Sequence, residues 1–234
     1  MKIGVITDLH NNSIALEVVL KEFKTQGVEG IICSGDIIGI GPSPEEVVSR
    51  IRNMKNLIAC IKGNHESYLI DGMKDSKMDE QERRFHEWEH KLLSNKSIQF
   101  LSSLSMKKIL KINGKTINVI HYAYEGNHYK GFIRNPNVDD LDELFTKIDA
   151  DIIIYGHDHS PSHIEGNKIY INPGALGCPG KDINIARAGI LNINDIVTYQ
   201  QLNLEYNVQD VIDKIEKLNY PAKDIIKKIF YGIK

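Results

Sequence analysis

Five short polar blocks, each directly after an apolar run, hold most of the side chains that could carry out chemistry in this chain. The blocks are Asp8-Leu9-His10, Gly35-Asp36, Gly63-Asn64-His65-Glu66, His121-Tyr122 and Gly156-His157-Asp158-His159. Together they supply carboxylate, amide and imidazole groups, which can hold two hard or borderline metal ions beside each other. A metal pair suggests hydrolysis of a phosphate ester, because two cations can clamp both the attacking and the leaving oxygen.

The first and the last block place two polar side chains one residue apart. At the end of a strand, this spacing sends Asp8 and His10 to the same side of the chain, where both could hold one ion. His157 and His159 repeat the spacing with two imidazoles. On its own, the first pair is better explained by an aspartate that caps a loop, whereas the second pair favours a metal site.

The three middle blocks add a bridging group and a candidate proton donor. Asp36 could bridge two cations, because a carboxylate has two oxygens, although a turn aspartate explains it as well. The amide oxygen of Asn64 suits a hard cation, and His65 beside it could assist the leaving oxygen or stabilise transition-state charge. The alternative for this block is an asparagine-capped helix with a surface histidine. His121 ends a predicted strand, where a structural histidine is the alternative.

Alternating strands and helices in the first half are predicted to bring these blocks together. Apolar runs at 2–7, 30–34 and 57–61 indicate strands, and segments 13–25 and 44–53 have helical patterns. Strands separated by helices pair in parallel with right-handed crossovers. Sites form at the carboxyl ends of such strands, which is where the blocks lie.

The predicted helix at 44–53 carries a start signal in its first residues. Ser43 is the expected N-cap, Pro44 occupies the first helical position, and Glu46 follows three residues after the cap. We therefore expect the side chain of Ser43 to cap this helix.

The second half is predicted to form a second sheet, after a helical insertion at 67–106 that holds the only tryptophan, Trp88. Two-residue turn signals divide three pairs of strands, at Asn113-Gly114, Gly166-Asn167 and Asn194-Asp195. These pairs are expected to be antiparallel hairpins. The other predicted elements are a helix at 139–147, a strand at 151–155, and terminal helices at 208–218 and 222–230.

Composition excludes several classes of function. The net charge of −2 leaves no basic stripe for long nucleic acid or an anionic membrane. No apolar run is long enough to span a bilayer, and the N-terminus lacks the apolar core of a signal peptide. The three cysteines predict no disulfide framework, with Cys33 and Cys60 as buried thiols and Cys178 in a plain loop. We therefore expect a cytoplasmic protein.

The five blocks, taken in order, resemble the calcineurin-like metallophosphoesterase superfamily, specifically its small bacterial and archaeal phosphodiesterase or phosphatase-like branch. The matching motifs are D-x-H, G-D, G-N-H-E, a histidine after a strand, and G-H-x-H, followed by Asn-Pro-Gly at 172–174. The resemblance covers roughly residues 1–200. It implies an α/β fold of four layers, an αββα sandwich of two mixed sheets flanked by helices, in one domain over 1–234 with the helical insertion at 67–106 over the site and terminal helices at 207–234.

The resemblance also implies a ligand set for two divalent ions, with Asp36 bridging both and His65 as a catalytic histidine that binds neither. The ligands of one ion would be Asp8, His10 and His159, and those of the other Asn64, His121 and His157. A mixed nitrogen and oxygen set suits Mn²⁺, which we expect to support activity in vitro, as well as Fe, Zn, Ni or Co.

Three features depart from the family pattern. Tyr122 stands where glycine often follows the histidine, and Asp158 replaces the usual threonine or serine between the last two histidines. The insertion at 67–106 is longer than in the smallest members. None of these removes a ligand, but each could reshape the substrate pocket.

These observations predict a dinuclear-metal-dependent phosphoesterase that hydrolyses phosphomonoesters or phosphodiesters by attack of a metal-bridging hydroxide, with Asp36 and His65 as catalytic residues. The expected partner is a small phosphorylated substrate, and a homo-oligomer remains open. One alternative is a nucleotide or dinucleoside polyphosphate hydrolase, in which four aromatic residues could stack a base or else pack the insertion. They are Trp88, Tyr122, Tyr124 and Tyr129. A protein phosphatase and a non-catalytic interaction scaffold are further alternatives.

Overall fold

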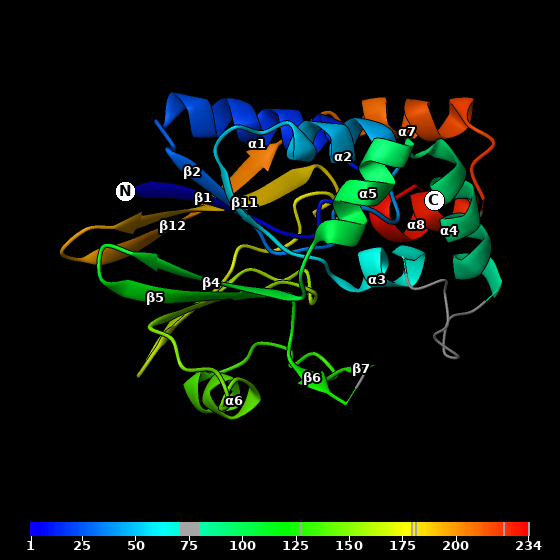
Figure 1. The fold of residues 1–234 in the computed structure, drawn as a ribbon. Coiled ribbons are helices and arrows are strands. Elements are labelled where there is room, and N and C mark those ends of the chain that lie inside the picture. The colour runs from blue at the N-terminus through cyan, green and yellow to red at the C-terminus, as the bar shows by residue number, and fades with distance from the viewer. Residues whose placement is uncertain (71–79, 127, 179, 181, 222, 234) are drawn as a thin grey trace.

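The computed structural model describes residues 1–70, 80–126, 128–178, 180, 182–221 and 223–233. Two five-stranded mixed sheets lie face to face, and helices cover their outer faces (Figure 1). This is the four-layer α/β arrangement that the sequence predicts. Within the described residues, no helix combines the length and the apolar character needed to cross a membrane.

The first sheet has the strand order β12-β11-β1-β2-β3. Its parallel part consists of β1 (Lys2–Ile6), β2 (Gly30–Cys33) and β3 (Leu57–Cys60). The connections are the helices α1 (Ser13–Thr25) and α2 (Pro44–Arg52), which pack on the outer face. The polar blocks that follow the three strands consequently meet at one edge of this sheet.

The last hairpin also belongs to the first sheet, which differs from its predicted place in the second. Strand β11 (Ile185–Ile193) pairs antiparallel with β1, and β12 (Val197–Glu205) continues the sheet. Nearly every residue of β11 is buried. Helices pack on one face of this strand and the second sheet packs on the other. The turn pattern predicted the hairpin but contained no information about its partner strand.

The second sheet has the order β4-β5-β8-β10-β9. Its parallel centre consists of β5 (Lys115–Ile120), β8 (Ile152–Ile154) and β10 (Ile169–Asn172). Two hairpins add β4 (Lys107–Ile112) and β9 (Ser162–Glu165) at the edges. The first turn has positive φ at both central residues, as the predicted Asn-Gly signal requires. Helix α6 (Val138–Leu144) covers the outer face of this sheet.

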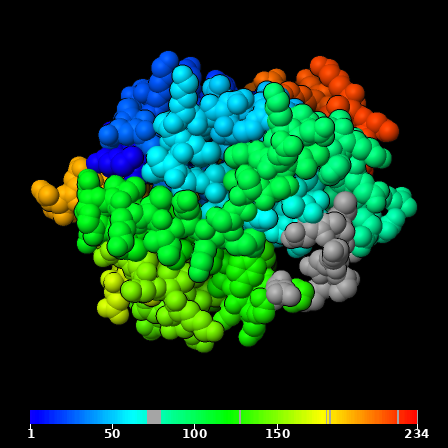
Figure 2. All heavy atoms as spheres, in the orientation of Figure 1, coloured from blue at the N-terminus to red at the C-terminus, as the bar shows by residue number. Residues whose placement is uncertain are grey.

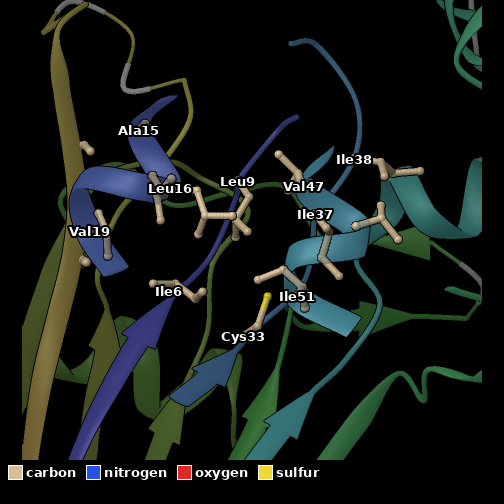
Figure 3. Packing of buried hydrophobic residues seen from close by; sticks show 14 of the residues in the cluster. Ile6, Leu9, Ala15, Leu16, Val19, Cys33, Ile37, Ile38, Val47 and Ile51 are labelled. Atoms are coloured by element: carbon tan, nitrogen blue, oxygen red, sulfur yellow. The ribbon is translucent and has the colours of Figure 1, made fainter. Parts of the chain in front are cut away.

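Branched aliphatic side chains fill the space between the two sheets. Each contributes roughly 1.5–3 kcal/mol relative to an exposed side chain, so the facing sheets form a rigid support. Fully buried members include Ile3, Val5, Ile32, Ile117, Val119, Ile152, Ile154 and Ile171. A second cluster packs the first sheet against α1 and α2, with Ile6, Leu16, Val19, Val47 and Ile51 pointing at one another (Figure 3).

Residues 71–79 of the predicted insertion lie outside the described residues, and the described part is helical, as predicted, and lies at the edge where the polar blocks meet. It comprises α3 (Asn64–Ile70), α4 (Glu80–Leu92) and α5 (Asn95–Ser103). Helices α4 and α5 form a continuous surface next to the residues around α2 (Figure 2). Phe85 and Trp88 of α4 pack on Tyr220, which lies between α7 (Val208–Lys217) and α8 (Lys223–Tyr231). The terminal helices therefore brace the insertion.

The predicted cap of α2 is wrong in one respect. Pro44 occupies the first helical position, but the side chain of Ser43 makes no capping hydrogen bond. The ammonium group of Lys214 instead donates to Ser43 Oγ over 3.1 Å and to Glu46 Oε2 over 2.7 Å. A cation from α7 thus engages both side chains that would have formed the capping box.

Candidate metal centre

The loops after β1 and β2 hold Asp8, His10 and Asp36 in place through backbone hydrogen bonds to each other. Asp8 N donates to Gly35 O over 3.0 Å, and His10 N donates to Asp36 O over 3.1 Å. Leu9, between the two ligand candidates, is fully buried and lies among the side chains near the ends of α1 and α2 (Figure 3). Leu9 is directed into the core, whereas Asp8 and His10 on either side of it are directed toward His159.

Five of the seven predicted ligands have a left-handed backbone, which is uncommon for residues other than glycine. Such a conformation costs about 1–3 kcal/mol for each residue and persists only where the surroundings impose it. The five are Asp8 (φ 51°), His10 (φ 44°), Asp36 (φ 50°), His157 (φ 78°) and His159 (φ 62°). Strain concentrated at these positions is typical of functional loops.

One cluster of polar atoms forms around the first predicted ion position. His10 Nε2 lies 3.1 Å from His159 Nε2. Asp8 Oδ1 lies 3.8 Å from His10 Nε2 and 3.5 Å from His159 Nε2. Asp8 Oδ1 is buried and has no hydrogen-bond partner among the described residues. Three donor atoms thus converge on one point between two strands that are almost 150 residues apart in the chain.

A second cluster lies next to the first. Asn64 Oδ1 is 3.2 Å from His121 Nε2 and 3.0 Å from His157 Nδ1. Asp36 Oδ2 joins the two clusters, since it lies 3.2 Å from His121 Nε2 and 4.0 Å from His10 Nε2. The structure therefore brings all seven predicted ligand side chains together, in two groups that share Asp36.

Hydrogen bonds on the far side of two imidazoles orient their free nitrogens toward the clusters. His10 Nδ1 lies 3.2 Å from Ile38 O, and His121 Nδ1 lies 2.8 Å from Ser34 O. Because a carbonyl oxygen only accepts, Nδ1 carries the proton and Nε2 presents its lone pair in the neutral ring. Histidines that bind metals are held in this way, so the donor set fits two borderline divalent cations.

Electrostatics divides the ligand candidates by charge. Burial lowers the pKa of His10 well below its usual value, aided by the neighbouring His159 and His65, so its ring is neutral. Burial also acts on His121, but the adjacent Asp36 outweighs it and raises the pKa of His121 to about 10. Burial alone would raise the pKa of Asp36, whereas the charges of His121 and His65 hold it well below the usual range.

His65 lies beside both clusters at the start of α3. Its backbone N donates to Asp36 Oδ1 over 3.0 Å, and its ring centroid is 5.0 Å from that of His10. Burial lowers the pKa of His65 to about 4. Gly39 makes room for this ring, because a Cβ at Gly39 would lie 2.5 Å from His65 Nδ1.

Glu66 supports the loop that carries Asp36. Its carboxylate accepts from the backbone N–H groups of Asp36 and Gly63 through Oε2, over 3.0 and 2.7 Å. Oε1 accepts from Ile37 and Ile38, over 2.7 and 3.0 Å. The sequence motif contained Glu66 but gave it no function. A buried carboxylate that accepts four backbone donors is a structural support of the site.

Two buried residues of α4 were missed in the sequence. Glu89 accepts from Gly39 N over 2.7 Å and from the side-chain amide of Asn11. His86 Nδ1 lies 3.1 Å from the carboxylate of Glu89, and the ring of His86 lies 5.3 Å from that of His65. The spacing of Phe85, His86 and Glu89 on one face of a helix was the available signal.

Cys178 contacts the site, whereas the sequence predicted a plain loop position. Its Sγ lies 3.5 Å from His159 Nδ1, and the thiol is fully buried, which raises its pKa. The loop that carries it folds back on β1, since Gly177 N donates to Asp8 O over 3.0 Å. This contact between distant segments had no local signature in the sequence.

The four aromatic candidates for base stacking separate into two groups. Trp88 packs within the insertion, and Tyr122 is almost completely buried. Tyr129 stacks on the imidazole of His157 with ring centroids 5.0 Å apart, and Tyr124 lies 4.2 Å from Tyr129. These two tyrosines belong to the short hairpin of β6 (Tyr124–Glu125) and β7 (His128–Tyr129). This hairpin therefore lies beside the second cluster.

Comparison with known proteins identifies the family. A model of the calcineurin-like phosphoesterase superfamily domain matches residues 1–195. An uncharacterised protein of Methanocaldococcus jannaschii is 30% identical over 94% of this chain and 93% of its own, and the phosphodiesterase YfcE of Escherichia coli is 22% identical over 87% and 93%. A metallophosphoesterase structure from Sphaerobacter thermophilus has a TM-score of 0.80 at 25% identity, over 100% of this chain and 99% of that one. As its motifs predicted, this chain belongs to the calcineurin-like phosphoesterase superfamily.

Proposed function

We propose that this protein is a metal-dependent phosphoester hydrolase that acts on phosphomonoesters or phosphodiesters. The observation that carries the proposal is the pair of donor clusters joined by Asp36, with His65 at their side. Similarity to an E. coli phosphodiesterase supports a phosphoric ester as substrate. The proposed ligands are Asp8, His10 and His159 for one ion, Asn64, His121 and His157 for the other, and Asp36 for both.

The residues of the chain have distinct tasks in this proposal. Two bound cations would polarise the phosphate ester and supply the nucleophile from water. Asp36 would contact both cations, because its single carboxylate lies beside His10 of one cluster and His121 of the other. His65 lies where it can hydrogen-bond an ester oxygen, since its ring is beside His10 while its backbone is tied to Asp36. The mixed nitrogen and oxygen donors suit Mn²⁺, Fe, Zn, Ni or Co.

A variant of His65 tests the catalytic part of the proposal. His65→Gln removes the imidazole without touching a proposed ligand, so turnover of bis-p-nitrophenyl phosphate is expected to fall about 100-fold or more. After loading with two equivalents of Mn²⁺, the metal content measured by elemental analysis is expected to equal that of the wild type, because His65 is no ligand of the two-ion centre. His90→Gln, at an exposed position of α4, is the matched control and is expected to keep full activity. Equal turnover in the two variants would contradict a catalytic role of His65.

A substrate panel distinguishes the remaining classes. It contains phosphodiesters, phosphomonoesters, nucleotides, dinucleoside polyphosphates and phosphopeptides, assayed with Mn²⁺. A preference for nucleotides is supported by the neighbouring rings of Tyr124 and Tyr129, because aromatic rings bind bases by stacking at about 1–3 kcal/mol for each base. Tyr124→Ala would then raise KM for nucleotides and leave KM for small diesters unchanged. Absence of activity on every substrate would favour a non-catalytic scaffold.

A further inference from the structure

A third group of potential metal ligands lies next to the proposed centre, on the insertion. His65 of α3 and Glu82 and His86 of α4 each present a ligand atom, and these three atoms lie within 4.8 Å of one another. The group formed by Asp36, His121 and His157 meets the same separation. By this geometric measure, the third group is as closely assembled as part of the centre itself.

His86 has the orientation of a metal-binding histidine. Its side chain is fully buried, and Nδ1 lies 3.1 Å from the carboxylate of Glu89. A carboxylate that accepts from Nδ1 leaves a lone pair on Nε2, which is how ligand histidines are held in zinc proteins. His86 Nε2 and His65 Nδ1 are both buried atoms with no hydrogen-bond partner in the described part of the chain. A buried polar atom without a partner is costly, and a cation would remove that cost.

We propose that His65, Glu82 and His86 form a third cation site, selective for zinc-like ions and separate from the two-ion centre. Two imidazoles and one carboxylate, with water in the fourth position, are a common zinc environment. In a tetrahedral site with Zn–N bonds of 2.0–2.1 Å, ligand atoms are about 3.3 Å apart, so the three side chains need only a small inward movement. Glu82 is partly exposed.

The shared histidine gives the site a regulatory consequence, which rests on the proposed function of His65. An imidazole with a cation on one ring nitrogen cannot take up a second ring proton, so His65 can no longer pass a proton to the leaving oxygen of the ester. Zinc beyond the first two equivalents therefore inhibits the enzyme, although the two-ion centre stays filled. Binding at the third site itself does not depend on the catalytic proposal.

Zinc stoichiometry tests the site without reference to activity. The metal-free protein is titrated with Zn²⁺ alone, and the wild type is expected to bind three ions. His86→Gln and Glu82→Gln are each expected to bind two. The matched controls are His90→Gln and Glu87→Gln, which alter exposed positions of the same helix, and both are expected to bind three. Glu82→Gln keeps the experiment decisive if the buried His86 variant folds poorly.

An activity measurement on the same proteins separates this site from the proposed function. Starting from protein with two equivalents of zinc, a third is expected to lower wild-type turnover at least tenfold and to leave turnover of Glu82→Gln unchanged. Two bound ions in the wild type, or equal stoichiometry in the variants and their controls, would overturn the proposal. Three ions in the wild type and two in the variants, with no turnover in any protein, would support the site and refute the hydrolase. A loss of turnover in His86→Gln at unchanged stoichiometry would overturn the site and indicate that His86 only positions His65.

Discussion

The two halves of the candidate centre are held in place by different means. The loops of the first sheet carry Asp8, His10, Asp36 and Asn64, and all four residues are almost fully buried. The second sheet contributes His121, His157 and His159, and the side chain of His159 is 28% exposed. One half of the site is therefore part of the protein interior, whereas the other half reaches its surface.

The supporting hydrogen bonds differ in the same way. The first-sheet loops direct their backbone N–H groups at two buried carboxylates, those of Glu66 and Glu89. In the second half, backbone carbonyls accept from Gly156 N and Ala175 N, over 2.9 and 3.1 Å, and one backbone N–H, that of His157, donates to the carboxylate of Asp8 over 3.1 Å. Loops that follow parallel strands no longer take part in the backbone hydrogen bonds of the sheet, so their N–H groups need other acceptors. The comparison suggests that side-chain changes weaken the first half far more than the second.

Glu66→Gln is expected to have the largest effect. Each carboxylate oxygen of Glu66 accepts hydrogen bonds from two backbone N–H groups. In the glutamine variant an NH₂ group takes the place of one oxygen, so two buried N–H groups lose their acceptor. Loss of acceptors for buried donors predicts a decrease of about 3 kcal/mol in the free energy of unfolding. Urea denaturation measures it, with Glu87→Gln as the exposed control. A change below about 1 kcal/mol would show that Glu66 does not support the loop.

The candidate ligands could be proposed from the sequence because each polar block is a local signal and the ordered set resembles a known family. A polar block after an apolar run marks the end of a strand, and the one-residue spacing predicted that Asp8 and His10 point the same way. The order of strands and helices predicted that the first three blocks meet at one edge. The two sheets and the helical insertion follow from the same patterns together with the family resemblance.

The supporting residues could not be predicted because their partners are distant in the chain. Glu89 hydrogen-bonds Asn11 across 78 residues, and Cys178 reaches His159 through a loop that folds back on β1. The placement of β11 beside β1 likewise depends on which edge of the sheet is open. A buried histidine or glutamate on a charged helix looks like a solvated one until the face it packs against is known.

The pH dependence of metal binding is expected to differ between the two ion positions, because His10 of the first half and His121 of the second half differ in charge. His10 is neutral, whereas Asp36 raises the pKa of His121 to about 10, so His121 keeps its proton at neutral pH in the metal-free protein. A cation must displace that proton, and its affinity should rise about tenfold for each pH unit between 7 and 9. If the pKa of His121 were near 6.5, the metal affinity would stop rising above about pH 7.5.

Calorimetry measures this proton directly. Titrations at pH 7.5 in buffers of different ionisation enthalpy should show release of about one proton for the cation that binds next to His121. The cation held by Asp8 and His10 should release fewer, because no imidazolium has to be discharged at His10. Equal proton release at the two ion positions, or an affinity that is constant above pH 7.5, would contradict the difference in charge between His10 and His121.

Asp158→Asn is the counterpart of the Glu66 variant in the second half and is expected to have the smallest effect, with the opposite sign. Asp158 accepts through Oδ1 from Ser160 N over 3.1 Å and from the amide of Asn172, and an asparagine oxygen can accept both. Burial raises the pKa of Asp158 to about 7, above the usual value of 3.8, so the folded protein loses stability as pH rises from 4 to 7. The Asp158→Asn variant carries no charge at this position and does not lose this stability. In the metal-free protein at pH 8, its free energy of unfolding should exceed that of the wild type by about 1 kcal/mol, and the difference is small because partial exposure screens the charge of Asp158. Urea denaturation in a chelator at pH 4 and pH 8, with the exposed Asp149→Asn as control, measures the difference. A destabilised variant at pH 8 would mean that the second half also relies on a buried carboxylate.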